Sequence, residues 1–262
     1  MLKLENITLP FTAGTVDEKK ALTNLSLHLE KGDFVTILGS NGAGKSTLFN
    51  TIAGTYTPDS GKIYLDGKDI TSLPDYKRSK EIGRLFQDPL KGTAPNMTIE
   101  ENLALAYLRA NHTKSPFSML SKADRAEFRE RLAMLNLGLE ERMRQPVGLL
   151  SGGQRQALTL LMATLVTPKI LLLDEHTAAH APGTAEIVLE LTKKIVAENN
   201  ITCLMITHNL ASSLALGNRT IMMADGRVVL DIGGEERKGL TVDDLLQRFR
   251  TQGLDNARIM LS

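Results

Sequence analysis

The sequence predicts an α/β fold with a core of parallel strands, an antiparallel flank and an inserted helical subdomain. Three observations carry this prediction. A short apolar run at residues 34–38 precedes a glycine-rich turn and a helix-compatible segment, 45–53, with Gly54 placed to end the helix. Later in the chain, short apolar runs alternate with longer helical patterns. Between these parts, residues 98–145 are rich in Leu, Ala, Glu and Arg, which favour helix.

Two segments near the N-terminus predict the antiparallel flank. Residues 2–9 and 25–29 alternate apolar and polar side chains, as half-buried strands do. The polar stretch 12–20 separates them, so we expect two paired strands that lead into the strand at 34–38. A further short strand is expected at residues 62–65, between two glycine turns.

The glycine-rich turn matches the phosphate-loop pattern G-x-x-x-x-G-K-[ST], and it has the strand and helix that this motif requires. Glycines let consecutive backbone N–H groups point inward and bind an anion, and the helix N-terminus adds positive potential. Lys45 would reach the β- and γ-phosphates of a nucleotide, and the Ser46 hydroxyl would bind Mg²⁺. A chance glycine-rich turn is the alternative. The predicted nucleotide-binding residues are Gly39, Ser40, Asn41, Gly42, Ala43, Gly44, Lys45, Ser46 and Thr47.

The pattern changes after Gln87, which follows an expected strand. Residues 88–96 contain two prolines and a glycine, and helical composition follows. We therefore expect residues 88–150 to form a helical subdomain, inserted into an α/β core made of residues 1–87 and 151–262.

Two features are expected inside this subdomain. Ser121, with Asp124 three residues later, is a start signal for a helix. Residues 124–144 carry most of the local charge of the chain, and such runs are usually solvated. We expect them to form an exposed helical face.

The α/β pattern returns near Gln154. We expect a helix from there, then a strand at 169–173, a helix at 184–198, a strand at 201–207, and a terminal hairpin and helix. Asp174 and Glu175 directly follow the first of these strands. In an open parallel sheet, ligands bind at the carboxyl ends of the strands, where the phosphate loop also lies. There Asp174 can hold Mg²⁺ through its water shell, and Glu175 can orient or deprotonate the attacking water. A solvated acidic turn is the alternative.

A second anion-binding helix end is expected at Ser151, Gly152, Gly153 and Gln154. The serine is placed as an N-cap, and the glycines open the helix that follows. The chain thus has two phosphate-binding helix ends but only one lysine-bearing loop. Two chains placed head to tail would supply both elements to each nucleotide.

Composition narrows the function classes. The net charge of +1 gives no basic field for nucleic acid. No run approaches the roughly 18–20 apolar residues of a membrane span, and the N-terminus has no apolar signal-peptide core. Cys203, the only cysteine, lies in the apolar run 201–206, which predicts a buried, inert thiol in a reducing compartment. We expect a cytosolic protein.

With these motifs in this order and at about this spacing, the chain resembles the nucleotide-binding subunit of the ATP-binding cassette (ABC) family. The resemblance is carried by the phosphate loop, Gln87, residues 150–154, residues 171–175 and His208, and it covers essentially the whole chain. It implies a phosphate-loop (RecA-like) α/β core, ATP and Mg²⁺ as nucleotide and metal, and ATP hydrolysis coupled to transport.

The resemblance also implies roles for single residues. Gln87 would contact Mg²⁺ and sense the nucleotide, and His208 would contact the γ-phosphate. Phe11 lies about where the family places an aromatic ring that stacks on adenine, although a core or loop phenylalanine is the alternative. Ser151 and Gly153 would bind the γ-phosphate of the ATP held by a partner subunit.

One stretch departs from the family pattern. After Glu175 the family usually has Pro or His, then Thr-x-x-Leu-Asp, whereas His180 and Ala181 stand here in place of the Leu and Asp. Because Ala181 cannot form the hydrogen bonds of an aspartate at the dimer seam, we expect weaker closure of the dimer. A metal site formed by His176 and His180 is an alternative, but no third ligand is evident.

Three functions are compatible with these features. The first is the ATPase subunit of a transporter, most readily an importer of an amino-acid-type solute. It would act as a homodimer or cassette heterodimer at the inner face of the membrane, with a separate membrane permease and an extracytoplasmic solute-binding protein. The second is a soluble ABC ATPase acting on ribosomes or DNA, which a single cassette and a net charge near zero disfavour. The third is a poorly hydrolysing ATP-binding scaffold, which only His180 and Ala181 support.

Overall fold

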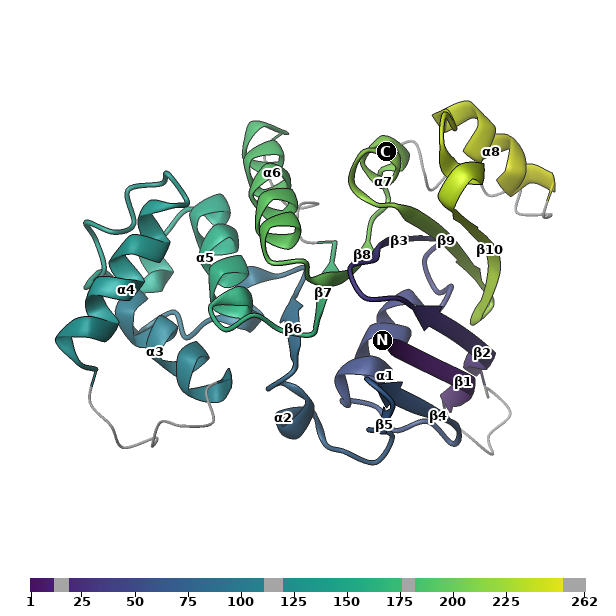
Figure 1. Ribbon diagram of the computed structural model, residues 1–262, viewed down its shortest axis with the longest axis horizontal. Coiled ribbons are helices and arrows are strands. Elements are labelled where there is room, and N and C mark those ends of the chain that lie inside the picture. Colours follow the sequence, from purple (N-terminus) through teal and green to yellow (C-terminus); the bar gives the residue numbers. More distant parts are fainter. Residues whose placement is uncertain (12–18, 111–119, 176–181, 252–262) are drawn as a thin grey trace. The chain divides into compact units, whose positions relative to one another are not determined.

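The computed structural model describes residues 1–11, 19–110, 120–175 and 182–251 (Figure 1). These residues form two compact units. The first unit is drawn from Met1–Arg78 and Thr202–Ser262, and the second is Ser79–Ile201. Each unit combines strands and helices, and the predicted α/β class is confirmed.

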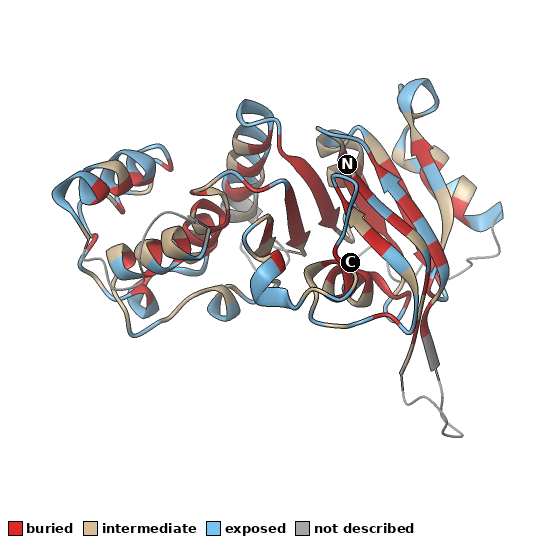
Figure 2. Ribbon diagram, turned by 60° about the horizontal axis from the view of Figure 1, so that its bottom comes forward, coloured by how far each residue is buried: buried red, intermediate tan, exposed pale blue. Residues whose placement is uncertain are grey.

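An antiparallel sheet makes up one part of the first unit. β1 (Leu2–Phe11) pairs with both β2 (Lys19–Leu29) and β4 (Ser60–Leu65), and β4 pairs with the short β5 (Lys68–Asp69). In Figure 2, buried and exposed residues alternate along these strands, as expected for a sheet with one covered face. This sheet is the predicted antiparallel flank.

β2 begins earlier than expected, at residue 19 rather than 25. Its pairing with β1 continues past an irregularity, because Leu22 lies opposite Leu9 after a register shift. Asn24, at φ 47°, has left-handed backbone geometry at this irregularity. The bulge breaks the alternation of apolar and polar residues, which is why the sequence pattern ended there.

The other strands of the first unit run in the order β10-β9-β3-β8. β3 (Phe34–Leu38) lies between two parallel neighbours, β8 (Thr202–Ile206) and β9 (Arg219–Ala224), and β10 (Arg227–Gly233) returns antiparallel to β9. All five residues of β3 and of β8 are buried, which explains their uninterrupted apolar character. Cys203 is fully buried in β8 as expected, and burial raises the pKa of its thiol well above the ordinary value.

The described part of the first unit also contains the helices α1 (Lys45–Ala53), α2 (Asp75–Arg78), α7 (Leu210–Leu216) and α8 (Val242–Thr251), with the 3-10 turn η3 (Gly234–Arg237). α1 ends as predicted at Gly54, which has φ 87° and closes the last turn with its N–H. α7 and α8 pack on β9 and β10 through a cluster of buried apolar side chains. Its members are Leu38, Leu210, Met222, Ile232, Leu245 and Phe249.

Among its described residues, the second unit has a parallel pair of strands and four longer helices. β6 (Ile82–Leu85) pairs with β7 (Ile170–Asp174). The helices are α3 (Ile99–Ala110), α4 (Lys122–Ala133), α5 (Gly152–Thr164) and α6 (Pro182–Glu198), with the 3-10 turns η1 (Pro89–Gly92) and η2 (Val147–Leu149). α5 lies at the centre, because α3, α4, α6, β6 and η1 all contact it.

The charged run 124–144 has one exposed and one buried side. Arg125, Arg129 and Arg131 are exposed as predicted, but Phe128 and Leu132 between them are fully buried in the core of this unit. Helix α4 also ends at Ala133, so the second half of the run is turn rather than the predicted helix. Asn136 and Gly138, at φ 54° and 66°, supply the left-handed geometry that interrupts the helix there.

The predicted start of α4 is confirmed. The Ser121 hydroxyl accepts a hydrogen bond from the Asp124 N–H, and the Asp124 carboxylate accepts one from the Ser121 N–H. The predicted domain division at residues 88 and 150 stays a prediction. Both α3 and α4, which belong to that predicted helical subdomain, lie in the second unit. Among the helices that the structure describes, none combines the length and apolar character needed to cross a membrane.

Candidate nucleotide-binding site

The phosphate loop connects β3 to α1 in the first unit, as predicted. Gly39, Gly42 and Gly44 have positive φ angles of 148°, 82° and 100°, which side-chain-bearing residues rarely adopt. Gly44 is the residue that caps α1, so its conformation directs the chain into the helix. The local backbone geometry that an anion-binding loop needs is therefore present.

Lys45 lies against the loop that it follows. Its side chain is buried, and Nζ donates hydrogen bonds to the carbonyl oxygens of Gly39 at 2.6 Å and Ser40 at 3.0 Å. These backbone oxygens hold the ammonium group at the mouth of the loop, where a bound phosphate would compete for it. Ser46 is exposed at the first turn of α1, so its hydroxyl can reach a ligand.

Backbone atoms of Ala21 and Gly226 pack directly behind the loop, and we call them the backbone wall. A Cβ atom on Gly44 would lie 2.5 Å from the carbonyl oxygen of Ala21 in β2 and 3.2 Å from Cα of Gly226. Gly226 belongs to the β9–β10 turn. The Gly226 N–H donates a hydrogen bond to the Ala43 carbonyl at 3.1 Å, and the Gly226 carbonyl accepts one from the Thr23 N–H at 3.0 Å. The loop is thus shaped by β2 and by the distant β9–β10 turn.

His208 lies at the same edge of the first unit's parallel strands as the phosphate loop. Ile37 and Ile206 are paired neighbours in β3 and β8, and the Thr207 N–H donates to the Ile37 carbonyl at 3.2 Å. Asn209, which directly follows His208, caps the N-terminus of α7 through its side chain. His208, the predicted γ-phosphate contact, therefore follows β8, which is hydrogen-bonded to β3, the strand that precedes the loop.

Of the two predicted acidic residues in the second unit, Asp174 ends β7 and Glu175 follows it, and each has a partner in or just after β6. The Gln87 amide donates to the Glu175 carboxylate, with 3.3 Å between Nε2 and Oε2. Asp174 forms an ion pair with Arg84, with 3.9 Å between Oδ2 and Nη2. The parallel pairing of Leu85 with Leu173 brings these side chains together. Glu175 also has a left-handed backbone, φ 43°, an uncommon geometry for glutamate that is typical of functional sites.

Arg84 is a site residue that sequence reasoning missed. Its guanidinium lies 4.5 Å from the centre of the Phe86 ring, a cation–π distance, while it pairs with Asp174. Only 15% of the Arg84 side chain is exposed. The available signal was a cation inside an apolar strand just before Gln87, since such a buried cation needs a nearby carboxylate.

The second helix end has the predicted N-cap. The Ser151 hydroxyl accepts from the Gln154 N–H at 3.3 Å, and the Gln154 side chain accepts from the Ser151 N–H at 3.2 Å. α5 begins at Gly152, slightly earlier than expected, because Ser151 is the cap. Arg155 fastens the preceding turn by donating to the carbonyls of Gly148 and Leu150. Ser151 and Gly152 are both exposed, so this helix end is accessible.

Some predicted residues lie outside the described part of the chain. The side chain of Phe11 is among them, although its backbone ends β1. His176, His180 and Ala181 also lie outside it, so their expected roles at a dimer seam or a metal site stay predictions. Within the residues that the structure describes, no group of three or more His, Cys, Asp or Glu side chains is arranged to hold a metal ion.

Comparison with known proteins agrees with this geometry. The family model described as ABC transporter matches residues 22–178. A tyrosine transport ATP-binding protein of Clostridioides difficile is 45% identical over 249 residues, covering 95% of this chain and 98% of that protein. The methionine import ATP-binding protein MetN of Corynebacterium efficiens is 35% identical over 233 residues. The aligned region covers 87% of this chain and 61% of that protein.

A solved structure shows the same fold at full length. It is a dimeric ATP-binding cassette in a post-hydrolysis state bound to ADP and Pi, with a TM-score of 0.78 and 31% identity, covering 92% of this chain and 100% of that one. The family match spans both the phosphate loop and the Asp174–Glu175 pair. The chain therefore belongs to the ABC transporter family and is an ATP-binding and ATP-hydrolysing cassette of that family.

Proposed function

We propose that this cassette powers the import of an amino-acid-type solute through a separate membrane permease. The observation that supports this proposal is the 45% identity to a tyrosine transport ATP-binding protein, which the chain matches over 98% of that protein's length. Import proteins recur among the relatives, for methionine and for spermidine and putrescine. The cassette would act at the inner face of the membrane, and an extracytoplasmic solute-binding protein would deliver the solute.

The experiment that tests this function is reconstitution with a candidate membrane permease from the same genome. We expect the purified complex in liposomes to hydrolyse ATP and to take up labelled tyrosine or another amino acid in an ATP-dependent way. A cassette with Lys45→Ala should support neither process. Hydrolysis by the isolated chain without any co-purifying membrane protein would instead favour a soluble ATPase.

In this proposal the chemistry is phosphoryl transfer to water. The glycine-rich loop and Lys45 bind the phosphates, and His208 contacts the γ-phosphate. Glu175 accepts the proton of the attacking water or orients it, and the hydrogen bond from Gln87 fixes the direction of its carboxylate. Arg84 forms an ion pair with Asp174, whereas Gln87 donates to Glu175. The two adjacent carboxylates therefore have different partners, and in this proposal Asp174 serves Mg²⁺ and Glu175 serves the attacking water.

The donor atoms fit a magnesium ion. Mg²⁺ prefers oxygen ligands and keeps several of its waters. The Ser46 hydroxyl, the Gln87 amide oxygen and the Asp174 carboxylate are oxygen donors, and Ser46 and Gln87 are exposed. These three residues would hold the ion, which would neutralise charge on the β- and γ-phosphates.

ATP-dependent head-to-tail dimerisation is our first expected result. It rests on the two helix N-termini predicted to bind phosphate, those of α1 and α5, of which only α1 carries a lysine, Lys45. With Glu175→Gln and saturating ATP, gel filtration should show a dimer. Adding Ser151→Ala to that variant should leave ATP binding intact and shift the protein toward monomer, because Ser151 would contact the ATP of the partner. A monomer in the Glu175→Gln variant, with ATP shown to be bound, would contradict the shared-site arrangement.

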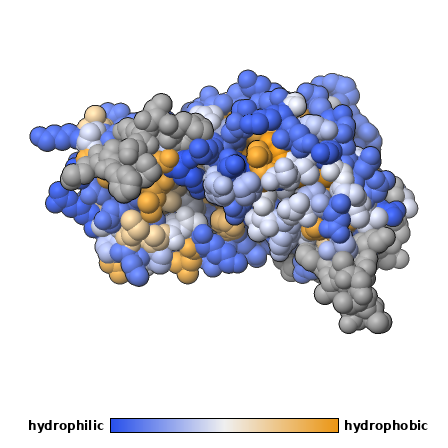
Figure 3. Space-filling view, turned by 90° about the horizontal axis from the view of Figure 1, so that it is seen from below, coloured by the Kyte–Doolittle hydropathy of each residue, from blue (hydrophilic) through white to orange (hydrophobic). Residues whose placement is uncertain are grey.

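The permease should dock on the segment that follows Gln87. Leu90 in η1 is 46% exposed and Leu105 in α3 is 50% exposed, so both offer apolar surface to a partner. Figure 3 shows apolar patches among hydrophilic side chains on the part of the surface that the second unit forms. Because Gln87 contacts Glu175, a partner bound at η1 would lie next to a residue that responds to nucleotide.

Site-directed cross-linking measures this docking. In a Cys203→Ser background, Leu90→Cys and Leu105→Cys should cross-link to the permease, and the yield should change when ATP is added. Arg227→Cys, at an exposed position of the β9–β10 hairpin, is the matched control and should not cross-link. Cross-links from Arg227→Cys alone would show that the docking surface is elsewhere.

A further inference from the structure

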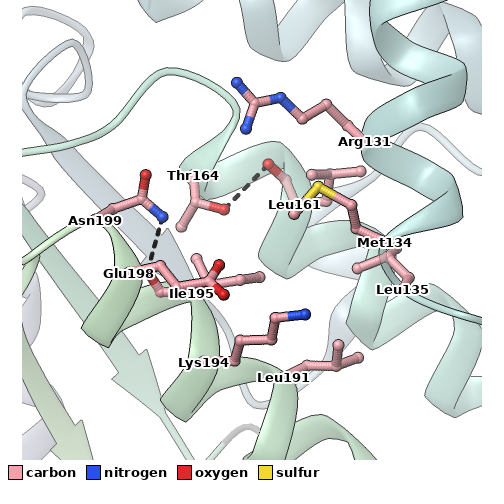
Figure 4. Close-up of a pocket in the computed structure, with 10 residues that line it drawn as sticks. All are labelled: Arg131, Met134, Leu135, Leu161, Thr164, Leu191, Lys194, Ile195, Glu198 and Asn199. Carbon is pink, nitrogen blue, oxygen red and sulfur yellow. Dashed lines mark hydrogen bonds between the residues drawn. The ribbon is translucent and has the colours of Figure 1, made fainter.

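A small hollow lies between three helices of the second unit, and none of the predicted site residues lines it. Its volume is about 120 Å³, and it is lined from α4, α5 and α6 (Figure 4). Five of its ten lining residues are apolar and five are polar or charged. The apolar lining residues are Met134, Leu135, Leu161, Leu191 and Ile195.

Three charged side chains surround the opening. Arg131 extends from α4, and Lys194 and Glu198 extend from α6 on the other side of the hollow (Figure 4). Lys194 and Glu198 are one helical turn apart, yet neither forms an ion pair with any residue that the structure describes, and the same is true of Arg131. The order Lys then Glu along a helix is the less favourable one for an i,i+4 pair, which agrees with their separation.

The neutral polar groups at the opening already have internal partners. The Thr164 hydroxyl donates to the Leu160 carbonyl at 2.8 Å, and the Asn199 amide donates to the Ile195 carbonyl at 2.9 Å. The groups left to recognise a ligand are therefore two cations, one carboxylate and the apolar side chains of the lining. Solvated surface charges would account for the cations, but they would not account for the apolar hollow between them.

Size and charge together define a ligand class. An apolar cavity of about 150 Å³ can hold a benzene molecule, so this hollow suits a ring or a branched alkyl group. Ligand pockets commonly combine an apolar lining with a few polar groups that fix orientation. We propose that the hollow binds a small apolar zwitterion, with the chemistry of an α-amino acid that has a large apolar side chain.

In the proposed complex, the apolar group fills the hollow against Leu161 and Ile195. The carboxylate accepts hydrogen bonds from Arg131 and Lys194, and the ammonium group donates to Glu198. Such a ligand would connect α5, which begins at the Ser151 cap, with α6, which lies beyond Glu175 in the chain. The hollow is lined by residues of the second unit alone, so binding there does not involve the phosphate loop of the first unit.

Three probes of equal ring size test the charges separately: L-phenylalanine, 3-phenylpropionate without the ammonium, and phenethylamine without the carboxylate. Titration calorimetry of the nucleotide-free chain should show that L-phenylalanine binds at least about 10-fold more tightly than either analogue, because each analogue lacks one charged hydrogen bond. Lys194→Gln should weaken the binding of L-phenylalanine and of 3-phenylpropionate. Glu198→Gln should weaken L-phenylalanine and phenethylamine.

The matched controls are Lys193→Gln and Glu190→Gln. Both residues are exposed on α6 but do not line the hollow, so these variants should bind all three probes like the parent chain. All four substitutions are at exposed positions, where loss of folding is not expected. The proposal is overturned if L-phenylalanine does not bind at millimolar concentration. It is equally overturned if L-phenylalanine binds no better than the singly charged analogues, or if the control variants weaken binding as much as Lys194→Gln.

Discussion

Replacing Glu175 with glutamine is expected to slow ATP hydrolysis by about 10²–10⁴-fold, the usual contribution of a positioned general base. Glutamine has the same shape and can still accept the hydrogen bond from Gln87, so the site should keep its geometry. Only the ability to take a proton from water is lost. Phosphate release under saturating ATP measures the rate, and binding of a fluorescent ATP analogue should be unchanged.

Two further variants separate chemistry from packing. Glu186→Gln, at an exposed position of α6, removes the same charge from the same unit and should leave hydrolysis unchanged. Gln87→Ala removes the partner of Glu175 but not the carboxylate, so it should cost less than Glu175→Gln. If Glu175→Gln kept its rate within about threefold of the parent chain, Glu175 would not be the base.

Replacing Gly44 with alanine is expected to lower ATP affinity by about 10–100-fold. The residue has φ 100°, and an added Cβ would lie 2.5 Å from the Ala21 carbonyl oxygen, too close for any real contact. Backbone strain of this kind costs about 1–3 kcal/mol, and relief requires the loop to move away from β2. The loop would then no longer present its N–H groups in the geometry that a phosphate needs. Binding of the ATP analogue and the midpoint of thermal unfolding measure the two effects.

Gly67→Ala is the matched control for Gly44→Ala. Gly67 has φ 76°, so alanine is strained there too, but an added Cβ would have no atom within 4 Å. It should lower thermal stability slightly and leave ATP affinity intact. Unchanged ATP affinity in Gly44→Ala would show that the backbone wall behind the loop does not determine its binding geometry.

Features set by local chain chemistry were predictable from the sequence. The helix caps at Gly54, Ser121 and Ser151 are at the predicted residues, because capping depends on side chains within a few positions. The strands β3 and β7, and the order of motifs around them, also follow the prediction, since buried parallel strands have a distinct apolar signature.

Features set by distant partners were not predictable. Arg84 could be recognised as a site residue only once β6 was seen beside β7, which brings it to Asp174. The left-handed geometry of Glu175 has no signature in composition. The charged run 124–144 predicts an exposed face because charged residues dominate its composition. Two apolar residues within it, Phe128 and Leu132, are nevertheless buried on the inner side of α4.

The position of β3 between β8 and β9 has a consequence for how the protein is made. A ribosome releases the phosphate loop early, but both neighbours of its strand come from residues 202–224, and the turn that supports the loop at Gly226 comes later still. The nascent chain therefore carries a complete nucleotide-binding motif long before it can hold that motif in shape. We therefore expect ATP to stabilise the fold only after residues 202–226 have been synthesised.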